Sequence, residues 1–403
     1  MHSPALKGYS DVFMTDWKDI QASLRDNDIA IEFVEREFYK GKRSLLAFLL
    51  KKNYSAPRVI PIDGFLEYYD SLSASISDRG LLYKNEVLYD KIWGALESEL
   101  VGVDNVYFSP DGVLNTLAIE NLSRNGDRSL FSKKLYRLSS TREILNQEKR
   151  KIGKAALYGG LDFNMYDTTT AKEDKDKKYQ RAAAVHGLLS DLAGTEEEIT
   201  QICEVLKDNS LNPDIYLERN GTEESFNNLS GNDYSIIHVA SHGKYLPSEE
   251  MSVENDYGEN RAMIRSCLYL AGANKTLLKG DVLPHDTNDG ILTAKEISLM
   301  DLKTVDIVVL SACETGLGDI TSEGVFGLQR GFKKAGVNSV LMSLWKVDDL
   351  ATSRLMTEFY TNWIGRKMSK YDSLEAAKKV IRETKGWEDP EYWAAFILLD
   401  GVE

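Results

Sequence analysis

The chain has 403 residues, of which 42% are hydrophobic, and it carries a formal net charge of −14. This length is enough for two or three domains with buried cores, and the acidic balance argues against non-specific binding to nucleic acid or to anionic membranes. No apolar run approaches the roughly 20 residues needed to cross a bilayer, and the three scattered cysteines form neither a disulfide framework nor a metal-binding pair. Residues 1–5 show no signal-peptide pattern, and the odd number and wide spacing of the cysteines favour a reduced, cytoplasmic setting.

The first half of the chain alternates predicted helices and strands. Leu or Ile recurs at every fourth position from Leu88 to Leu100, which predicts a helix over 85–100. The other predicted elements are a helix containing Trp17, Ile20 and Leu24, a strand at 29–34, short apolar runs at 45–50 and 58–62, and a strand at 105–108 before a Ser-Pro-Asp-Gly turn signal.

A polar, basic stretch at 141–154 is predicted to form a helix that leads out of the first half. We therefore divide the chain into an α/β supporting domain over 1–150 and a catalytic domain over 151–403. Residues 15–150 contain neither His nor Cys, so this part of the chain cannot supply a Cys/His pair. We expect it to buttress the sheet of the second domain.

The second half has a clearer alternation of strands and helices, which implies an α/β fold with a mostly parallel sheet covered by helices on both faces. The predicted strands lie at 155–161, 214–217, 234–240, 305–310 and 339–344. One predicted helix carries the apolar stripe of Ile199, Ile202, Cys203 and Leu206, and two further helices are predicted at 322–335 and 350–364. Two polar inserts, at 162–188 and 244–261, are either gating or self-cleavage segments or simple surface insertions.

Two chemically reactive side chains follow the two most apolar strands. His242 comes just after the strand at 234–240, and Cys313 comes just after the strand at 305–310. Ligands of open α/β sheets bind beyond the carboxyl ends of the strands, so the two side chains can meet there. A thiolate nucleophile needs an imidazole within hydrogen-bond reach, and the backbone N–H groups of Gly243 and Cys313 can serve as oxyanion donors. The alternative is that Cys313 is a small buried hydrophobe and that His242-Gly243 is a turn.

We predict no metal and no cofactor. His238 and His242 are four positions apart, but they lie on a predicted strand and lack the acidic partner of a His-Glu-x-x-His pattern. Strand alternation places His238 on a face of the sheet with Ile236 and Ala240, which predicts that His238 is packed in the core.

Two segments, His238-Val239-Ala240-Ser241-His242-Gly243 and Ser311-Ala312-Cys313-Glu314-Thr315-Gly316, resemble the CHAT family, caspase-like peptidases related to separase and usually found behind tetratricopeptide repeats. Further matching segments start at Phe108, Ser343 and Tyr392, so the resemblance covers roughly residues 15–400. It implies hydrolysis of peptide bonds by a metal-free dyad of His242 and Cys313, and it makes the supporting domain over 1–150 a candidate degenerate peptidase-like unit. It also implies a protein or peptide substrate, an activator or upstream repeat domain as partner, and roles in bacterial defence or programmed death.

The chain departs from the caspase pattern in two respects. Glu314 follows the proposed nucleophile, and the spacing from His242 to Cys313 exceeds the usual one of about 50 residues. Preference for aspartate is therefore not carried over. Asp162, Trp345 and Asp348 occupy the places where related folds form their specificity pocket, and the two carboxylates suit Arg or Lys before the scissile bond. Alternatively, Asp162 caps a turn and Asp348 starts a helix.

Two other functions stay open. The chain can be a catalytically silent interaction module that keeps the fold, although the presence of both His242 and Cys313 speaks against it. It can also be a small-molecule acyl hydrolase or an amidotransferase, but these enzymes need a third residue that orients the histidine, and the sequence identifies none.

Overall fold

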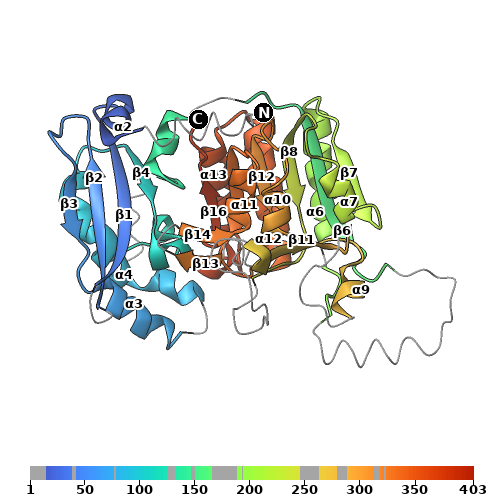
Figure 1. Cartoon of the computed structure of the whole chain (residues 1–403), viewed down its shortest axis with the longest axis horizontal. Coiled ribbons are helices and arrows are strands. Elements are labelled where there is room, and N and C mark those ends of the chain that lie inside the picture. Colours follow the sequence, from blue (N-terminus) through green and yellow to red (C-terminus); the bar gives the residue numbers. More distant parts are fainter. Residues whose placement is uncertain are drawn as a thin grey trace, which may run out of the picture. The chain divides into compact units, whose positions relative to one another are not determined.

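The computed structural model of the chain divides into two compact units. The first comprises Met1–Lys149, Ser322–Gly324 and Leu398–Glu403, and the second comprises Arg150–Thr321 and Val325–Ile397 (Figure 1). The structure describes residues 15–38, 42–76, 79–124, 132–146, 150–165, 188–192, 194–245, 263–278, 288–311, 318–321 and 324–403.

The first unit is built on a mixed sheet with the strand order β3-β2-β1-β4-β5. Antiparallel pairing joins β1 to β2 and β2 to β3, and parallel pairing joins β1 to β4 and β4 to β5. The bounds are β1 (Asp28–Phe38), β2 (Lys42–Leu50), β3 (Arg58–Pro61), β4 (Asn105–Ser109) and β5 (Lys134–Arg137), with helices α2 (Trp17–Ser23) and α3 (Phe65–Ser73). The strands predicted at 29–34 and 105–108 are confirmed.

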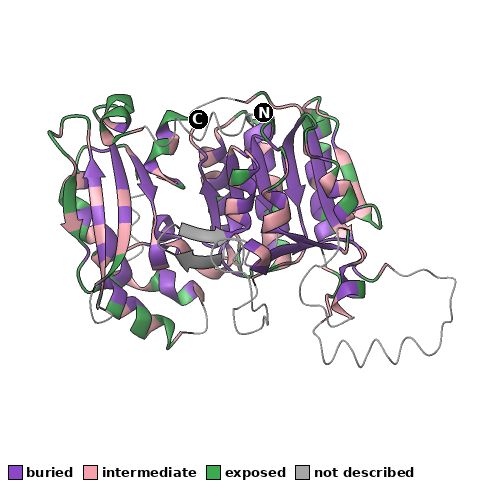
Figure 2. Cartoon of the chain, viewed as in Figure 1, coloured by how far each residue is buried: buried purple, intermediate pink, exposed green. Residues whose placement is uncertain are grey.

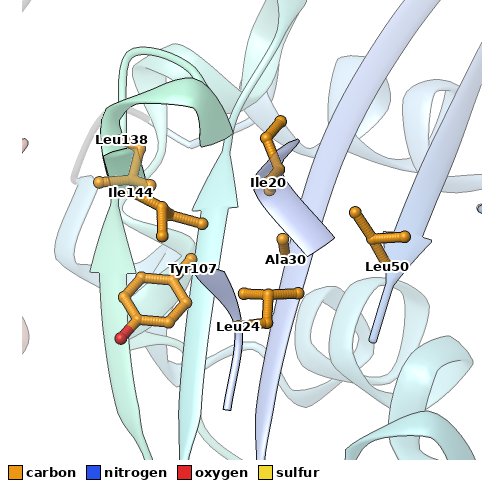
Figure 3. Packing of buried hydrophobic residues seen from close by; sticks show 7 residues of the cluster. All are labelled: Ile20, Leu24, Ala30, Leu50, Tyr107, Leu138 and Ile144. Atoms are coloured by element: carbon orange, nitrogen blue, oxygen red, sulfur yellow. The ribbon is translucent and has the colours of Figure 1, made fainter. Parts of the chain in front are cut away.

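One face of this sheet is covered by α2. The helix begins at a capping box, in which the side chain of Asp16 accepts from the backbone of Asp19 and the side chain of Asp19 accepts in return. Figure 3 shows the apolar cluster that α2 buries against the strands, which consists of Ile20, Leu24, Ala30, Leu50, Tyr107, Leu138 and Ile144. The predicted Trp17–Leu24 helix is thus confirmed, with Leu24 as its C-terminal cap.

Two predicted helices of the first half differ from the structure. The helix predicted at 85–100 has nearly the predicted extent, because 86–100 are helical throughout, but it is irregular: α4 (Glu86–Tyr89) is followed by a π-helical turn (Asp90–Gly94), and the segment ends in a 3₁₀ turn (Glu97–Leu100). The stretch at 141–154 is wrong in extent. In the stretch at 141–154 the described residues contain only one 3₁₀ helix (Thr141–Leu145) before a strand starts at Lys154. This stretch has no apolar stripe that packing could bury, so a longer helix gains nothing.

The second unit is built on a sheet with the strand order β16-β15-β12-β8-β6-β7, and the pairings β12–β15, β12–β8, β6–β8 and β6–β7 are all parallel. Both β8 and β12 are buried along their whole length, as Figure 2 shows. The bounds are β6 (Lys154–Leu161), β7 (Asp214–Glu218), β8 (Tyr234–Val239), β12 (Ile307–Leu310), β15 (Ser339–Ser343) and β16 (Phe396–Leu399). These positions confirm the predicted mostly parallel α/β sheet.

Helices cover both faces of this sheet. Two adjacent residues of β6, Tyr158 and Gly159, face helices on opposite sides of it. A Cβ built on Gly159 would lie 2.5 Å from Ile199 Cγ1 on one face, so α6 approaches the backbone closely there. The ring of Tyr158 contacts Phe226 on the other face. The helices are α6 (Thr195–Asp208), α7 (Glu223–Asn227), α11 (Leu328–Lys334), α12 (Asp349–Tyr360) and α13 (Lys370–Arg382).

The predicted helix at 322–335 is also wrong in extent. The helix α11 starts at Leu328, and a short strand β14 (Gly324–Gly327) precedes it, because glycine at both ends of that segment favours extended backbone over helix. A further small sheet had no predicted counterpart. It has the order β11-β10-β9 and consists of β9 (Gly243–Tyr245), β10 (Ser266–Tyr269) and β11 (Ile291–Thr293), and the short helix α9 (Ala273–Leu277) follows β10.

Among the described residues no helix is long and apolar enough to cross a membrane.

Candidate active site

The candidate site lies where β8 and β12 end side by side. These parallel strands pair in register, with Val239 opposite Leu310, and the backbone N–H of Ser311 donates to the carbonyl of Val239 at 3.0 Å. His242 and Cys313 are each three positions beyond a member of that pair. Cys313 itself lies outside the described residues.

The chain between β8 and His242 is held on both sides. The N–H of Ala240 donates to the carbonyl of Tyr158 in β6 at 2.7 Å, and the hydroxyl of the fully buried Ser241 donates to the carbonyl of Tyr269 in β10. The N–H of Tyr269 returns a hydrogen bond to the carbonyl of His242 at 2.9 Å. His242 therefore sits on a fixed backbone, and Gly243 continues directly into β9.

The imidazole of His242 is itself oriented. Its Nε2 lies 2.8 Å from the carbonyl oxygen of Ser190, and its ring packs on Phe163 with the centroids 5.1 Å apart. A carbonyl oxygen can only accept a hydrogen bond, so Nε2 carries the proton. In the neutral ring Nδ1 then holds the free lone pair, and it has no hydrogen-bond partner among the described residues. The Ser190 carbonyl supplies the orienting group that the sequence could not identify.

A buried polar network lies beneath this rim. Glu198 in the first turn of α6 accepts from Ser311 Oγ at 3.1 Å and lies 2.8 Å from His238 Nε2. The hydroxyl of Tyr360 in α12 lies 3.3 Å from the other ring nitrogen of His238. A neutral His238 satisfies all of these contacts, with Tyr360 donating to Nδ1 and Nε2–H donating to the carboxylate. Both nitrogens of the fully buried His238 are thus engaged, which confirms its prediction as a core residue.

Glu198 and Ser311 also line a small cavity of about 30 Å³, together with Ser241 and Asp349. Burial raises the pKa of the Asp349 carboxyl, and the nearby Lys346 offsets part of this rise. Asp349 is the first residue of α12 and directly follows the predicted Asp348. Nothing in the sequence marks Glu198 beyond its place in the acidic first turn of α6, and nothing marks Ser190.

The three residues predicted to bind substrate have other contacts in the structure. Asp348 is the N-cap of α12 and accepts from the backbone of Leu350 and Ala351 at 3.1 and 2.9 Å. Asp162 accepts from the N–H of Asn164 at 3.0 Å and from Arg219 at 3.2 Å. The indole of the buried Trp345 donates to the carbonyl of Glu391 at 3.2 Å.

A larger cavity of about 460 Å³ lies beside the carboxyl end of β6. It is strongly acidic, and its carboxylates belong to Asp162, Asp191, Glu196 and Glu218. Of these, Asp162 is paired with Arg219. Leu192 lines both this cavity and the smaller one.

The other two cysteines are buried. Cys203 faces the core from α6, as its place in the apolar stripe predicted, and Cys267 lies in β10. Burial raises the pKa of Cys267 to about 12, so its thiol stays protonated and unreactive near neutral pH. In the described part of the chain no group of three or more His, Cys, Asp or Glu side chains is arranged to hold a metal ion. The two polar inserts lie mostly outside the described residues, since 166–187 and 246–262 are among the gaps.

Comparison with known sequences identifies the class of protein. The CHAT domain pattern matches residues 84–401, which is most of the chain, and the chain therefore belongs to the CHAT domain family. Tetratricopeptide repeat protein 28 of Mus musculus is 37% identical over 111 residues, and that of Homo sapiens is 34% identical over 110 residues. Each alignment spans 27% of this chain but only 4% of the relative.

Among solved structures the chain is similar to the Arg-specific cysteine proteinase gingipain R, with a TM-score of 0.44 and 10% identity over 76% of this chain and 65% of that one. It is also similar to the Saccharomyces cerevisiae separase–securin complex, with a TM-score of 0.48 and 10% identity over 94% of this chain and 30% of that one.

Proposed function

We propose that the chain is a cysteine endopeptidase that hydrolyses a protein substrate, with Cys313 as nucleophile and His242 as general base. The observation that carries the proposal is the register of the parallel strands β8 and β12. Val239 faces Leu310 across the two strands, and His242 and Cys313 each follow three positions later in the sequence.

The orientation of His242 suits the role of a base. With Nε2–H donating to Ser190, Nδ1 accepts the thiol proton, and the thiolate sulfur attacks the carbonyl carbon of the scissile peptide. The N–H groups of Gly243 and Cys313 are proposed to stabilise the resulting oxyanion. His242 then returns the proton to the leaving amine, which leaves a thioester. A water that His242 deprotonates hydrolyses this thioester and frees the thiol.

A basic residue before the scissile bond fits the acidic surroundings of the site. The large cavity beside β6 presents four carboxylates and contains Asp162, so it can pair with an Arg or Lys side chain. For Asp348 the capping contacts favour a structural role, and the neighbouring Asp349, which lines the small cavity, is a second candidate. Asp348→Ala should therefore destabilise α12 by about 1 kcal/mol without changing substrate preference. A loss of basic preference in this variant would assign Asp348 to the pocket.

The experiment is a comparison of the parent chain with Cys313→Ala on a fluorogenic peptide library varied at the residue before the scissile bond. Cleavage by the parent alone, strongest after Arg or Lys, is the expected result. A thiol-reactive peptide probe, with Cys203 and Cys267 as buried internal controls, should label Cys313 selectively. Equal cleavage by both proteins would refute the assignment of Cys313.

The second candidate function is a catalytically silent interaction module. The match to repeat proteins favours a setting in which an upstream tetratricopeptide domain or an activator protein controls the chain. Silence of the parent in the library, both alone and with candidate protein partners, together with no labelling of Cys313, would favour the silent module.

A further inference from the structure

Asn274, in the short helix α9, is a fully buried polar side chain that makes three hydrogen bonds. Its Oδ1 accepts from the N–H of Leu189 at 2.9 Å, and its Nδ2 donates to the carbonyl of the same residue at 2.9 Å. Nδ2 also donates to Asn164 Oδ1 at 2.8 Å. The two contacts to Leu189 fix which way the amide faces, because a backbone N–H must meet the oxygen and a backbone carbonyl must meet the nitrogen.

Both segments that Asn274 holds continue directly into groups that touch His242. Leu189 is bonded to Ser190, whose carbonyl accepts from His242 Nε2. Asn164 is bonded to Phe163, whose ring packs on the imidazole, and the backbone N–H of Asn274 donates to the carbonyl of Phe163 at 3.0 Å. One buried amide therefore ties together the hydrogen-bond acceptor and the ring contact that set the orientation of His242.

We infer that Asn274 is a positioning residue for His242, and that its amide keeps the Ser190 carbonyl where it selects the Nε2–H form of the ring. The inference rests on the proposed function, because the orientation of His242 matters for turnover only if His242 is the base. Without the side-chain amide of Asn274, the segment that contains Ser190 loses both hydrogen bonds that Asn274 makes to Leu189. Nδ1 would then spend part of its time protonated or turned away from the thiol.

The test is Asn274→Ala, which keeps a good helix former in α9 while it removes all three side-chain hydrogen bonds. Two quantities are measured on the whole chain. The first is the kcat and KM of peptide cleavage, where we expect kcat to fall about 10- to 100-fold with KM nearly unchanged. The second is the ¹⁵N chemical-shift pattern of the His242 ring, assigned by its absence in His242→Asn. We expect it to change from the Nε2–H tautomer to a mixture.

A matched control separates positioning from loss of stability. Ser339→Ala also removes a buried hydrogen bond, the one that Ser339 Oγ donates to the carbonyl of Asp306 at 2.8 Å, but at the amino end of β15. This control should leave both kcat and the His242 ring pattern as in the parent.

The outcomes distinguish this inference from the proposed function. If the parent cleaves nothing but Asn274→Ala still changes the His242 ring pattern, the positioning role stands and the peptidase assignment falls. A folded Asn274→Ala with the ring pattern of the parent overturns the positioning role, whatever its activity. If Asn274→Ala does not fold, Asn164→Ala replaces it, because this variant removes only the 2.8 Å contact of an exposed residue. It should change kcat and the ring pattern in the same direction by a smaller amount, and no change in either would overturn the inference.

Discussion

The buried carboxyl of Glu223 should make the stability of the protein fall as the pH rises towards 7. Glu223 begins α7, its Oε2 accepts from the N–H of Gly290 at 3.0 Å, and its Oε1 has no hydrogen-bond partner among the described residues. Burial raises the pKa of this carboxyl from 4.5 to about 7, and the negative charges of Glu296 and Asp289 act in the same direction.

The sign and size of the effect follow from proton linkage. Between pH 4.5 and 7 the folded chain holds a proton on Glu223 that the unfolded chain has released. The stabilisation is complete below pH 4.5 and is lost as the pH rises through about 7. At roughly 1.4 kcal/mol per pKa unit, the loss is about 3 kcal/mol as an upper bound.

Glu223→Gln removes this titration and keeps an oxygen that accepts from Gly290. We expect the variant to be more stable than the parent at pH 8, by up to about 3 kcal/mol, and to lose this advantage at pH 4. Urea unfolding followed by circular dichroism at pH 4, 5, 6, 7 and 8 measures the difference. Glu224→Gln is the control, because it removes the same charge from the same turn at an exposed position. Parallel pH profiles of the parent and Glu223→Gln would refute the reasoning.

Three further predictions concern the sheets and the rim of the site. Glu120→Ala should destabilise the first unit by about 3–5 kcal/mol, because it leaves the guanidinium of Arg137 buried without the carboxylate that it contacts at 2.9 and 2.8 Å, and urea unfolding measures the loss. Gly159→Ala should cost about 1–3 kcal/mol of stability by pushing α6 off the sheet, and an unchanged melting temperature would contradict this. Ser311→Ala removes the hydrogen bond to the buried Glu198 and should slow alkylation of Cys313 several-fold by iodoacetamide, whereas Ser339→Ala should not.

Much of the second unit could be predicted because its packing is encoded locally. The stripe of Ile199, Ile202, Cys203 and Leu206 marks the buried face of α6, and all four side chains are buried. The continuous apolar run at 305–310 marks a strand covered on both faces. Periodicity of this kind depends on near neighbours in the chain, so a single sequence carries it.

Side-chain periodicity also explains why the irregular helix at 85–100 was predicted as a regular one. Leu88, Ile92, Leu96 and Leu100 recur at intervals of four residues, but an α-helix has 3.6 residues per turn, so such a stripe rotates around a regular helix. All four side chains are nevertheless buried, and the segment contains a wider π-helical turn at Asp90–Gly94. The spacing was a signal of irregular helix, which the prediction of one continuous helix overlooked.

The supports of His242 could not have been predicted, because each depends on a contact between distant positions. Asn274 is 85 positions from Leu189, and Ser190 is 52 positions from His242. Nothing in the composition around Asn274 marks it, since it follows the apolar residues of β10 and a short turn. A single sequence shows which residues carry reactive groups, whereas the groups that orient them are found only once the chain has been folded.

The two histidines of the His238-to-His242 segment illustrate this difference. The pattern alone shows two identical side chains four positions apart on one strand and its extension. In the structure His238 is fully buried with Glu198 and Tyr360 on its two ring nitrogens, so it has no lone pair left for chemistry. His242 is partly exposed, and its only hydrogen bond among the described residues holds the ring through one nitrogen and leaves the other available. A histidine that is fixed on one side and available on the other is what a general base requires, and a histidine engaged on both sides is a structural element. The distinction comes from their partners, not from their spacing, and it is the reason why His242 and not His238 is proposed as the base.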